Sequence, residues 1–321
     1  MHRFSRPSVR WWNSSTGNSL SRVAARPCAR CLRDPAVTAP SVRLDPFFLP
    51  VGSEQRFCVH VGPADGGATH GVVFVHPFAE EMNKSRRMAS LAARALAAAG
   101  VSVLMIDLRG CGDSPGDFAD ANWDAWLDDV AAAEAWLRER VPRVSLWGLR
   151  VGALLAAQRA AAGAGAFAGL LLWQPVTSGD QALTAFLRLQ VAGDMLGSSG
   201  TRVTVADLRK RLADGETLEI AGYRIAPSLA QGMSVASLAK CRPAVDSVQW
   251  LEVVTGEGRG VSPASRTVLA GWEAAGLPVA VSCVQGAPFW ASVETTESAP
   301  FVQATVEVME RICHPATPNG R

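Results

Sequence analysis

The sequence has no uninterrupted apolar run long enough to span a membrane. Its longest apolar stretch, residues 153–176, is interrupted by Gln158 and Arg159 and contains three glycines, as expected for a buried helix, a loop and a strand. The N-terminal segment also lacks the apolar core of a secretory signal. The seven cysteines are scattered and odd in number, which predicts a reducing compartment and a cytoplasmic location. A lone Cys-x-x-Cys pair, Cys28 and Cys31, has no second pair, so no metal site is expected.

Charge is scarce and unevenly distributed. Only 19% of the residues are charged and 48% are hydrophobic, which is typical of a globular protein. Residues 1–44 hold eight arginines and one acid, Asp34, and show no apolar periodicity. We expect this basic extension to lie outside the folded domain, as a targeting segment, a disordered tail or an over-extended translation start. Residues 45–321 carry a net charge of about −5, which argues against nucleic-acid binding.

From Pro46 onward, strand-like and helix-like segments alternate, which predicts a parallel sheet covered on both faces. The expected strands are residues 55–61, an early edge strand, then 72–76, 101–106, 143–147, 170–173, 248–254 and 279–283. The expected helices are residues 86–99, 123–140, 263–275 and 299–312, with a further apolar helix from Ala153. After Gln174 the pattern changes, and residues 178–245 are richer in charge and glycine. We therefore expect one α/β domain, residues 45–321, with a helical lid inserted at about 178–245.

Three polar segments follow strands in this pattern. His76-Pro77 ends the strand at 72–76. Residues 107–116, Asp-Leu-Arg-Gly-Cys-Gly-Asp-Ser-Pro-Gly, follow the strand at 101–106 and are rich in turn formers. Residues 148–152, Gly-Leu-Arg-Val-Gly, stand between a short buried strand and an apolar helix, a context that requires a sharp turn flanked by small residues.

Taken in this order, the three segments resemble the α/β-hydrolases. Residues 107–116 match the family's D-x-R-G-x-G-x-S-x-G loop, His76-Pro77 takes the place of its His-Gly oxyanion loop, and residues 148–152 take the place of its G-x-S-x-G nucleophile elbow. The resemblance covers residues 46–312. It implies an α/β-hydrolase fold, a mostly parallel doubly wound sheet with an inserted helical lid.

Four shorter segments resemble one branch of that superfamily, the exosortase A system-associated hydrolases of the second type. They are residues 46–50 (Pro-Phe-Phe-Leu-Pro), 76–84 (His-Pro-Phe-Ala-Glu-Glu-Met-Asn-Lys), 147–150 (Trp-Gly-Leu-Arg) and 288–290 (Pro-Phe-Trp). Those proteins are bacterial relatives tied to exopolysaccharide and protein-sorting gene clusters. The resemblance supplies a family context and establishes no reaction.

The nucleophile of the family is replaced. Arg150 stands at the position of the elbow serine, and a guanidinium cannot attack a carbonyl. The G-x-S-x-G pattern occurs literally at residues 112–116, but the residue after its serine is Pro115, which has no N–H for an oxyanion hole. We therefore expect Ser114 to be a structural loop serine.

The base is missing as well. The family draws its histidine from the loop after the last strand, here residues 284–290, and that loop contains none. Glu252 and Glu257 are the candidate acids near the end of the preceding strand, but they have no histidine to orient. The usual Ser-His-acid triad is thus absent from the sequence.

A rearranged centre is one alternative. The family's strand order places the loops after His76 and Asp107 side by side at the carboxyl edge of the sheet, where open α/β sheets bind ligands. Cys111 and Asp113 lie on the second loop, and a cysteine whose pKa is lowered by a histidine can act as a nucleophile. Alternatively, Cys111 is a small, partly buried residue.

Arg150 supports another interpretation. At an elbow it stands at a helix N-terminus, which favours anions, and a guanidinium can hold a carboxylate or phosphate in two-point contact. The alternative is an internal ion pair with Asp107, Asp113 or Glu80. Glu80 and Glu81 are expected either to place a carboxylate base at the pocket mouth or to belong to a solvated loop.

The expected pocket has backbone and aromatic components. The backbone N–H groups near Phe78 and Val151 are candidate oxyanion donors, and Trp147, Trp173 and Trp290 fall near predicted strand ends, where they would wall an apolar or sugar-stacking pocket.

Two functions fit these observations. The first is an exosortase-associated hydrolase of ester, thioester or acyl-type bonds, with catalytic residues His76, Cys111, Asp113 and Arg150. The second is a catalytically inactive pseudo-enzyme that binds an anionic ligand or a protein partner. The expected partners are a small ester, acyl or anionic molecule and proteins of the exosortase and exopolysaccharide system. No cofactor, metal or membrane span is expected.

Overall fold

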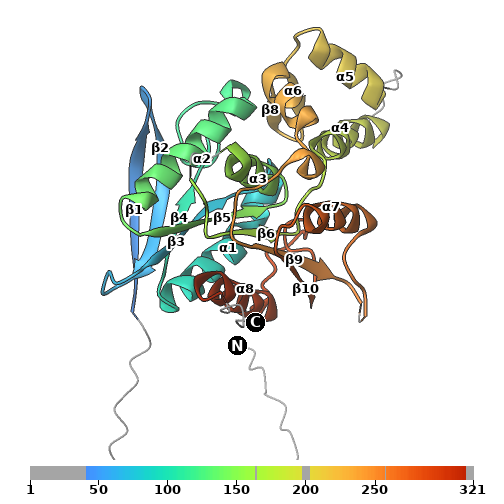
Figure 1. Ribbon diagram of the computed structural model, residues 1–321. Coiled ribbons are helices and arrows are strands. Elements are labelled where there is room, and N and C mark those ends of the chain that lie inside the picture. Colours follow the sequence, from blue (N-terminus) through green and yellow to red (C-terminus); the bar gives the residue numbers. More distant parts are fainter. Residues whose placement is uncertain (1–40, 163–164, 197–202, 257, 316–321) are drawn as a thin grey trace, which may run out of the picture. The chain divides into compact units, whose positions relative to one another are not determined.

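A mixed eight-stranded sheet forms the centre of the protein, in the order β1-β2-β4-β3-β5-β6-β9-β10 (Figure 1). The computed structural model describes residues 41–162, 165–196, 203–256 and 258–315, all within the unit Ala39–Arg321. From β4 to β10 the neighbouring strands run parallel, whereas β2 is antiparallel to both β1 and β4. The strands are β1 (Val42–Val51), β2 (Glu54–Pro63), β3 (His70–Val75), β4 (Val101–Ile106), β5 (Arg143–Leu149), β6 (Gly169–Trp173), β9 (Val248–Val254) and β10 (Val279–Gln285).

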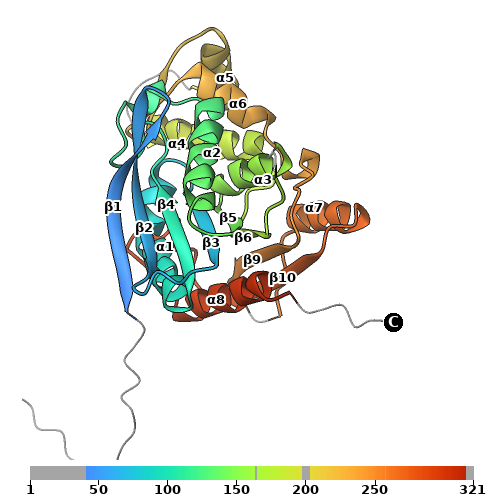
Figure 2. The ribbon, with the colours of Figure 1, turned by 60° about the vertical axis from the view of Figure 1, so that its left-hand side comes forward.

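Helices cover both faces of this sheet (Figures 1 and 2). Helices α1 and α8 pack together on one face, and α2, α3 and α7 lie on the other. Strands β3 and β6 are buried at every residue because both faces are covered, which explains the apolar runs at residues 71–75 and 169–173. The helices are α1 (Glu80–Ala98), α2 (Trp123–Arg138), α3 (Gly152–Ala162), α7 (Pro263–Ala274) and α8 (Ala299–Cys313). This is the doubly wound, mostly parallel architecture that the sequence predicts.

The N-terminal hairpin corrects two expectations. The strand expected at the edge, residues 55–61, is an inner strand, because β1 pairs with its outer side. Strand β1 contains Pro46 and Pro50, which argue against a strand in the sequence. An edge strand tolerates proline because the backbone N–H groups on its outer side need no hydrogen-bond partner in the sheet. Since β1 begins at Val42, the folded domain starts before the expected boundary at residue 45. The 1–40 part of the basic extension lies outside the described residues.

Helix α1 also begins earlier than expected. The sequence predicts a start at Arg86, but the charged run before it already forms helix from Glu80. Glu80 and Glu81 occupy the first turn, where the helix dipole favours negative charge. This extension brings two carboxylates to the carboxyl edge of the sheet.

The segment between β6 and β9, residues 174–247, is called the inserted segment below. It contains the residues, about 178–245, for which the sequence predicts a helical lid. Its helices are α4 (Gly179–Leu196), α5 (Val205–Ala213) and α6 (Pro227–Val235), and a short hairpin joins β7 (Leu218–Ile220) to β8 (Tyr223–Ile225). In Figures 1 and 2 the three helices gather at the top of the view, beyond the carboxyl ends of the parallel strands.

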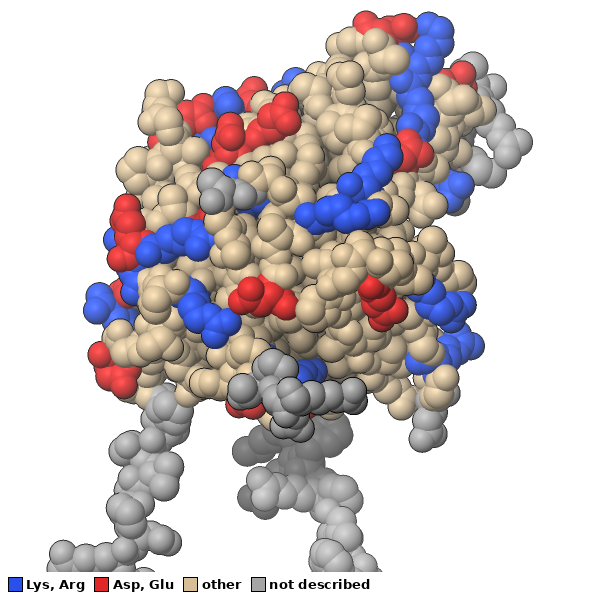
Figure 3. Space-filling model, viewed as in Figure 1, with Lys and Arg blue, Asp and Glu red and all other residues tan. Residues whose placement is uncertain are grey.

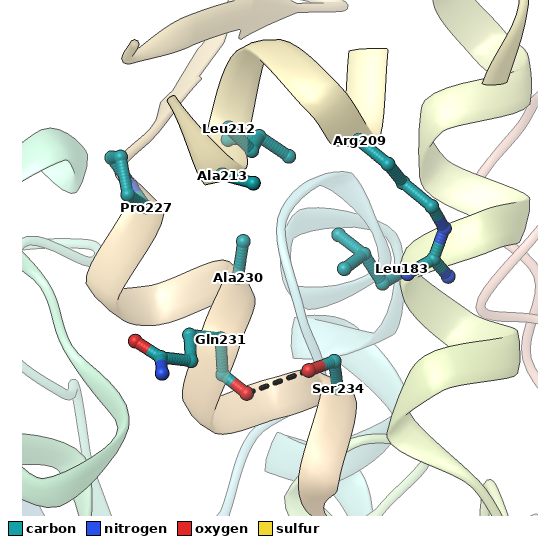
Figure 4. A pocket seen from close by; sticks show the side chains of 8 residues that line it. All are labelled: Leu183, Arg209, Leu212, Ala213, Pro227, Ala230, Gln231 and Ser234. Carbon is teal, nitrogen blue, oxygen red and sulfur yellow. Dashed lines mark hydrogen bonds between the residues drawn. The ribbon is translucent and has the colours of Figure 1, made fainter. Parts of the chain in front are cut away.

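A cavity of about 370 Å³ lies within the inserted segment, among α4, α5 and α6 (Figure 4). Arg209 is the charged side chain among its described lining residues. Its guanidinium pairs with the Asp180 carboxylate at 2.7 Å and donates to Thr184 Oγ1 at 2.7 Å. The charge is therefore already satisfied inside the segment.

The surface carries both signs of charge. On the face shown in Figure 3, acidic and basic side chains are interspersed between wide uncharged areas, with no broad patch of one sign. Within the described part of the chain, no helix is long and apolar enough to cross a bilayer.

Candidate functional site

The turn between β5 and α3 holds Arg150 in a left-handed backbone conformation, with φ +55°. Its N–H donates to the Trp173 carbonyl at 3.1 Å, and its carbonyl accepts from Ala153 N–H at 3.1 Å. A residue with a side chain reaches this conformation only at a cost of about 1–2 kcal/mol, so the surrounding structure must impose it. The strand–turn–helix geometry expected from residues 148–152 is thus present, with arginine at its centre.

The two glycines of this turn are required by close packing. A Cβ added at Gly148 would lie 2.5 Å from the Ala153 Cα. A Cβ added at Gly152 would overlap the Val75 carbonyl oxygen. The backbone of the turn is therefore pressed against the end of β3, which brings Arg150 beside the loop that follows β3.

The Arg150 side chain pairs with Glu81. Its Nε donates to Glu81 Oε1 at 3.1 Å, and both side chains remain partly exposed, at 25% and 29%. On the other side, the guanidinium carbon lies 5.4 Å from the ring centroid of Trp290, a cation–π contact. Trp290 comes from the loop after β10, where the family places its histidine. An internal ion pair with Asp107, Asp113 or Glu80 was one of the two alternatives for Arg150; an ion pair is present, but its partner is Glu81.

The environment of Glu81 acts on its pKa in two directions. Burial raises the pKa of Glu81 above its ordinary value, whereas Arg150 and then Lys84 lower it. Burial is the larger effect, so the carboxyl keeps a raised pKa despite its ion pair.

A cavity of about 230 Å³ opens beside this ion pair. Phe78 and Val151, the expected oxyanion-side residues, both line it, whereas Trp290 packs behind the guanidinium and is not among its lining residues. Val151 precedes the first residue of α3, and its N–H has no acceptor among the described residues. The lining residues are Phe78, Ala79, Glu80, Glu81, Arg150, Val151, Val176, Ala182, Ala185, Phe186, Leu189, Ala221 and Tyr223. We call this cavity the elbow pocket.

Backbone strain gathers at the elbow pocket. Among the described residues, four that are not glycine have positive φ, and three of them line this pocket: Ala79 at 52°, Arg150 at 55° and Ala221 at 50°. Strained backbone persists where the rest of the structure over-determines it, and it clusters at functional sites.

The inserted segment is tied to the mouth of the elbow pocket. The Tyr223 hydroxyl donates to Glu80 Oε2 at 3.0 Å, and Asn83 Nδ2 donates to the Tyr223 oxygen at 3.1 Å. Burial, and then the neighbouring Glu80, raise the pKa of Tyr223 to about 12, so it remains a phenol. Sequence reasoning missed Tyr223, although it is the one tyrosine of the chain.

His76 is buried and engaged at both ring nitrogens. Nδ1 donates to the Pro77 carbonyl at 2.7 Å, and Nε2 accepts from Leu108 N–H at 3.2 Å. Burial lowers the pKa of His76, against the opposing effect of Asp107. A neutral imidazole in this arrangement links the loops after β3 and β4 and has no free nitrogen for a substrate.

The other two residues of the expected rearranged centre lie on the loop after β4. Cys111 is buried, and burial together with Asp107 and Asp129 raises the pKa of its thiol. Asp113 is exposed, and its backbone N–H donates to Asp107 Oδ2 at 3.0 Å. No hydrogen bond joins His76 to Cys111 among the described residues. The structure brings the two loops together, as their adjacent strands predict, but gives the thiol no activating base.

Three more sequence candidates have structural partners. Ser114 accepts from Phe57 N–H at 2.9 Å and donates to the Asp107 carbonyl, as expected for a loop serine. Glu252 accepts hydrogen bonds from Trp250 Nε1, Ser262 N–H and the Ser265 hydroxyl, which fixes it at the start of α7. Glu257 lies outside the described residues.

The tryptophans at the strand ends divide into two kinds. Trp147 and Trp173 are fully buried on the α1–α8 side of the sheet, and their ring centroids are 4.5 Å apart. They are core residues of the domain, whereas the sequence led us to expect them at a pocket wall. Among the described residues, no group of three or more acidic, histidine or cysteine side chains is arranged to hold a metal ion.

Solved structures share this fold. Est1E from Butyrivibrio proteoclasticus, solved with ferulic acid, superimposes with a TM-score of 0.63 at 14% identity, covering 83% of this chain and 99% of that one. A proline iminopeptidase-related protein from Thermus thermophilus gives a TM-score of 0.55 at 18% identity, covering 84% and 98%. An esterase from Rhizomucor miehei gives 0.54 at 16% identity, covering 86% and 83%. At these identities the likeness establishes the fold.

The sequence itself matches a family model. No curated protein sequence matches the chain. The model described as serine aminopeptidase, S33, matches residues 67–250, more than half of the chain, from the loop before β3 to β9. The protein therefore belongs to the serine aminopeptidase (S33) family of α/β-hydrolases.

Proposed function

We propose that this protein is a non-hydrolysing member of the α/β-hydrolases whose elbow pocket binds an anionic ligand, held by Arg150. The observation that carries the proposal is the position of Arg150. The elbow presents the residue at its apex to the ligand space of the fold, and here that residue is a guanidinium lining a cavity of about 230 Å³.

The elbow also supplies favourable backbone groups. Val151, which precedes α3, has an N–H group with no acceptor among the described residues, and the helix dipole adds partial positive charge there. A carboxylate reaching the Arg150 guanidinium therefore meets donors from both side chain and backbone.

The polar groups around the pocket support binding without turnover. Hydrolysis by this fold needs a nucleophile, a base and an oxyanion hole. At the nucleophile position stands Arg150, and the loop after β10 contributes the Trp290 ring in place of an imidazole. His76 donates and accepts backbone hydrogen bonds, so it offers no lone pair to a nucleophile.

Hydrolysis of an ester, thioester or acyl-type bond, in the exosortase and exopolysaccharide context, is the second candidate. Its support is the family match and the Val151 N–H, which stands where an oxyanion donor is needed. It requires a chemical role for His76, Cys111 or Asp113, with Arg150 holding the substrate. Proteins of that sorting system would then be its partners.

One experiment separates the two candidates. The full-length protein and its His76→Ala, Cys111→Ala and Arg150→Ala variants are assayed with chromogenic esters and thioesters, and 3-phenylpropionate binding is measured by calorimetry. We expect rates equal to the buffer blank for all four proteins, and binding that Arg150→Ala abolishes. Wild-type turnover that collapses in His76→Ala or Cys111→Ala would establish the hydrolase instead. Binding unchanged in Arg150→Ala would overturn the proposed anion site.

A further inference from the structure

The ion pair between Arg150 and Glu81 in the elbow pocket rests on one hydrogen bond and leaves other donors and acceptors of both side chains without a hydrogen-bond partner. Arg150 carries five N–H donors and Glu81 two carboxylate oxygens. The one hydrogen bond between them joins Nε to Oε1 at 3.1 Å. The Nη groups of Arg150 and the Oε2 atom of Glu81 have no partner among the described residues, and both side chains line the pocket.

The charge balance of the pocket disfavours a simple anion. Two carboxylates, Glu80 and Glu81, and one guanidinium, Arg150, line it. Lys84 lies near enough to lower the pKa of Glu81 but is not among the lining residues. A bare carboxylate at Arg150 would be attracted by the guanidinium and repelled by the adjacent Glu81. A ligand with a positive charge alone would be attracted by Glu81 and repelled by the guanidinium of Arg150.

We infer that the elbow pocket takes a zwitterion, a free α-amino acid with an apolar side chain. Its carboxylate binds the unused Nη groups of Arg150, and its ammonium donates to Glu81 Oε2, with Glu80 as a further acceptor. In an α-amino acid the two charged groups share one carbon, which matches a guanidinium and a carboxylate in direct contact. This inference rests on the proposed function, because it assumes that Arg150 binds a carboxylate.

The rest of the pocket suits an apolar side chain. Phe78 and Phe186 meet edge to face with centroids 4.9 Å apart, and Val176 and Ala182 complete that wall. A cavity of about 230 Å³ is smaller than the roughly 300–1,000 Å³ of pockets for drug-sized ligands, and it fits a molecule the size of leucine or phenylalanine.

The charged end of the pocket is held in place before a ligand arrives. Trp290 lies against the guanidinium, and the strained backbone of Arg150 fixes the direction of its side chain. Tyr223 and Asn83 donate to one oxygen of Glu80 and so orient that carboxylate. Groups already positioned for a ligand lose little conformational freedom on binding, which favours affinity.

The test compares ligands that differ by one charge, using calorimetry on the full-length protein. The first set is L-phenylalanine, 3-phenylpropionate without the ammonium, and 2-phenylethylamine without the carboxylate. L-leucine, 4-methylpentanoate and isopentylamine form a second set, so that a poor fit of one side chain does not decide the result. We expect each amino acid to bind at least about tenfold more tightly than either of its single-charge analogues.

Two substitutions assign the charges to residues. Glu81→Gln should weaken amino-acid binding to the level of the des-amino acid, which should bind no more weakly than before. Arg150→Met should abolish binding of both. Arg94→Met and Glu273→Gln change exposed charges on α1 and α7 and should leave every affinity unchanged.

The outcomes separate this inference from the proposed function. If the des-amino acids bind as tightly as the amino acids and depend on Arg150, the zwitterion is wrong and the anion site stands. Amines that bind as tightly as the amino acids would overturn the zwitterion as well, because the carboxylate is then not recognised. If neither kind of acid binds in an Arg150-dependent manner, both the inference and the proposed anion site fail.

Discussion

Two regions at the carboxyl edge of the sheet, the elbow pocket and the loop after β4, use their polar residues in opposite ways. In the elbow pocket, Arg150 and Glu81 are partly exposed, touch at one point and sit on or beside strained backbone. In the loop after β4, residues 107–116, the polar groups of Asp107 and Ser114 are buried and bonded to neighbours in the fold. The contrast suggests a criterion for the ligand site that we propose, namely hydrogen-bonding capacity left unused rather than the presence of reactive residue types.

A buried carboxylate of helix α2 holds the loop after β4 in place. Asp129 of α2 accepts from Arg56 Nε at 2.7 Å and from Arg109 N–H at 2.7 Å, and the Arg56 and Asp129 side chains are almost fully buried. Arg56 also pairs with Glu54 at 2.8 Å. This cluster joins β2, α2 and the loop, so the loop is part of the stabilising framework of the domain.

The largest expected effect is the loss of stability when the buried Arg56–Asp129 ion pair is broken. Asp129→Ala leaves Arg56 buried without its main partner, and removal of one member of a buried ion pair costs about 3–5 kcal/mol. We expect the free energy of unfolding in urea to fall by that amount. The double variant Arg56→Met, Asp129→Leu should be more stable than Asp129→Ala, because it leaves no unpaired buried charge. A loss below about 1 kcal/mol would show that the loop does not depend on this ion pair.

The second prediction concerns Ser114. Ser114→Ala removes the acceptor of Phe57 N–H, and a buried donor without a partner costs about 1–3 kcal/mol. Urea unfolding should detect this loss, whereas ligand binding in the elbow pocket should not change. An esterase activity that disappears in Ser114→Ala would instead identify its literal G-x-S-x-G sequence as a working elbow and reverse the contrast between the two regions.

The architecture of the sheet was readable from the sequence because its signals are local. Strands β4 and β9 have the bounds that the apolar runs at residues 101–106 and 248–254 predict. The elbow was readable because Gly148 and Gly152 flank a turn that tolerates no Cβ. Strand β1 was not readable, because its prolines argue against a strand and its pairing with β2 depends on a position at the sheet edge.

The contacts of the site join residues that are far apart in the sequence, and no local sequence pattern predicts such contacts. Glu81 and Arg150 are 69 residues apart, and they meet because α1 starts six residues earlier than its apolar periodicity suggests. Tyr223 reaches Glu80 across 143 residues from a hairpin in the inserted segment. Residue types at the elbow led to the prediction that Arg150 holds an anion, whereas its partner Glu81 could be found only from the fold.

The third prediction tests the strain in the elbow. Arg150→Gly should be more stable than Arg150→Ala by about 1 kcal/mol, because glycine adopts positive φ without the clash of a Cβ. Both variants lack the guanidinium, so their difference in thermal unfolding reports the backbone alone. The same pair at Arg94, in the interior of α1, should show the opposite order, since glycine destabilises a helix by about 1 kcal/mol relative to alanine. Equal stability of the two Arg150 variants would mean that the turn relaxes and stores no strain.

The smallest effect is a pH dependence carried by Glu81. Its folded-state pKa lies above the ordinary value of 4.5, because burial outweighs the attraction of Arg150. Between 4.5 and that raised pKa the folded protein binds more protons at this site than the unfolded chain does, so the contribution of Glu81 to the free energy of unfolding increases as pH falls through this window and is constant below it. Glu81→Gln cannot titrate, so its melting temperature, measured across the same window, should rise less on acidification than that of the wild type. Glu273→Gln, an exposed control, should follow the wild type. A Glu81→Gln profile parallel to the wild type would show that Glu81 titrates as a solvated surface carboxyl does, and the elbow pocket would then lack the unevenly paired charges that distinguish it from the loop after β4.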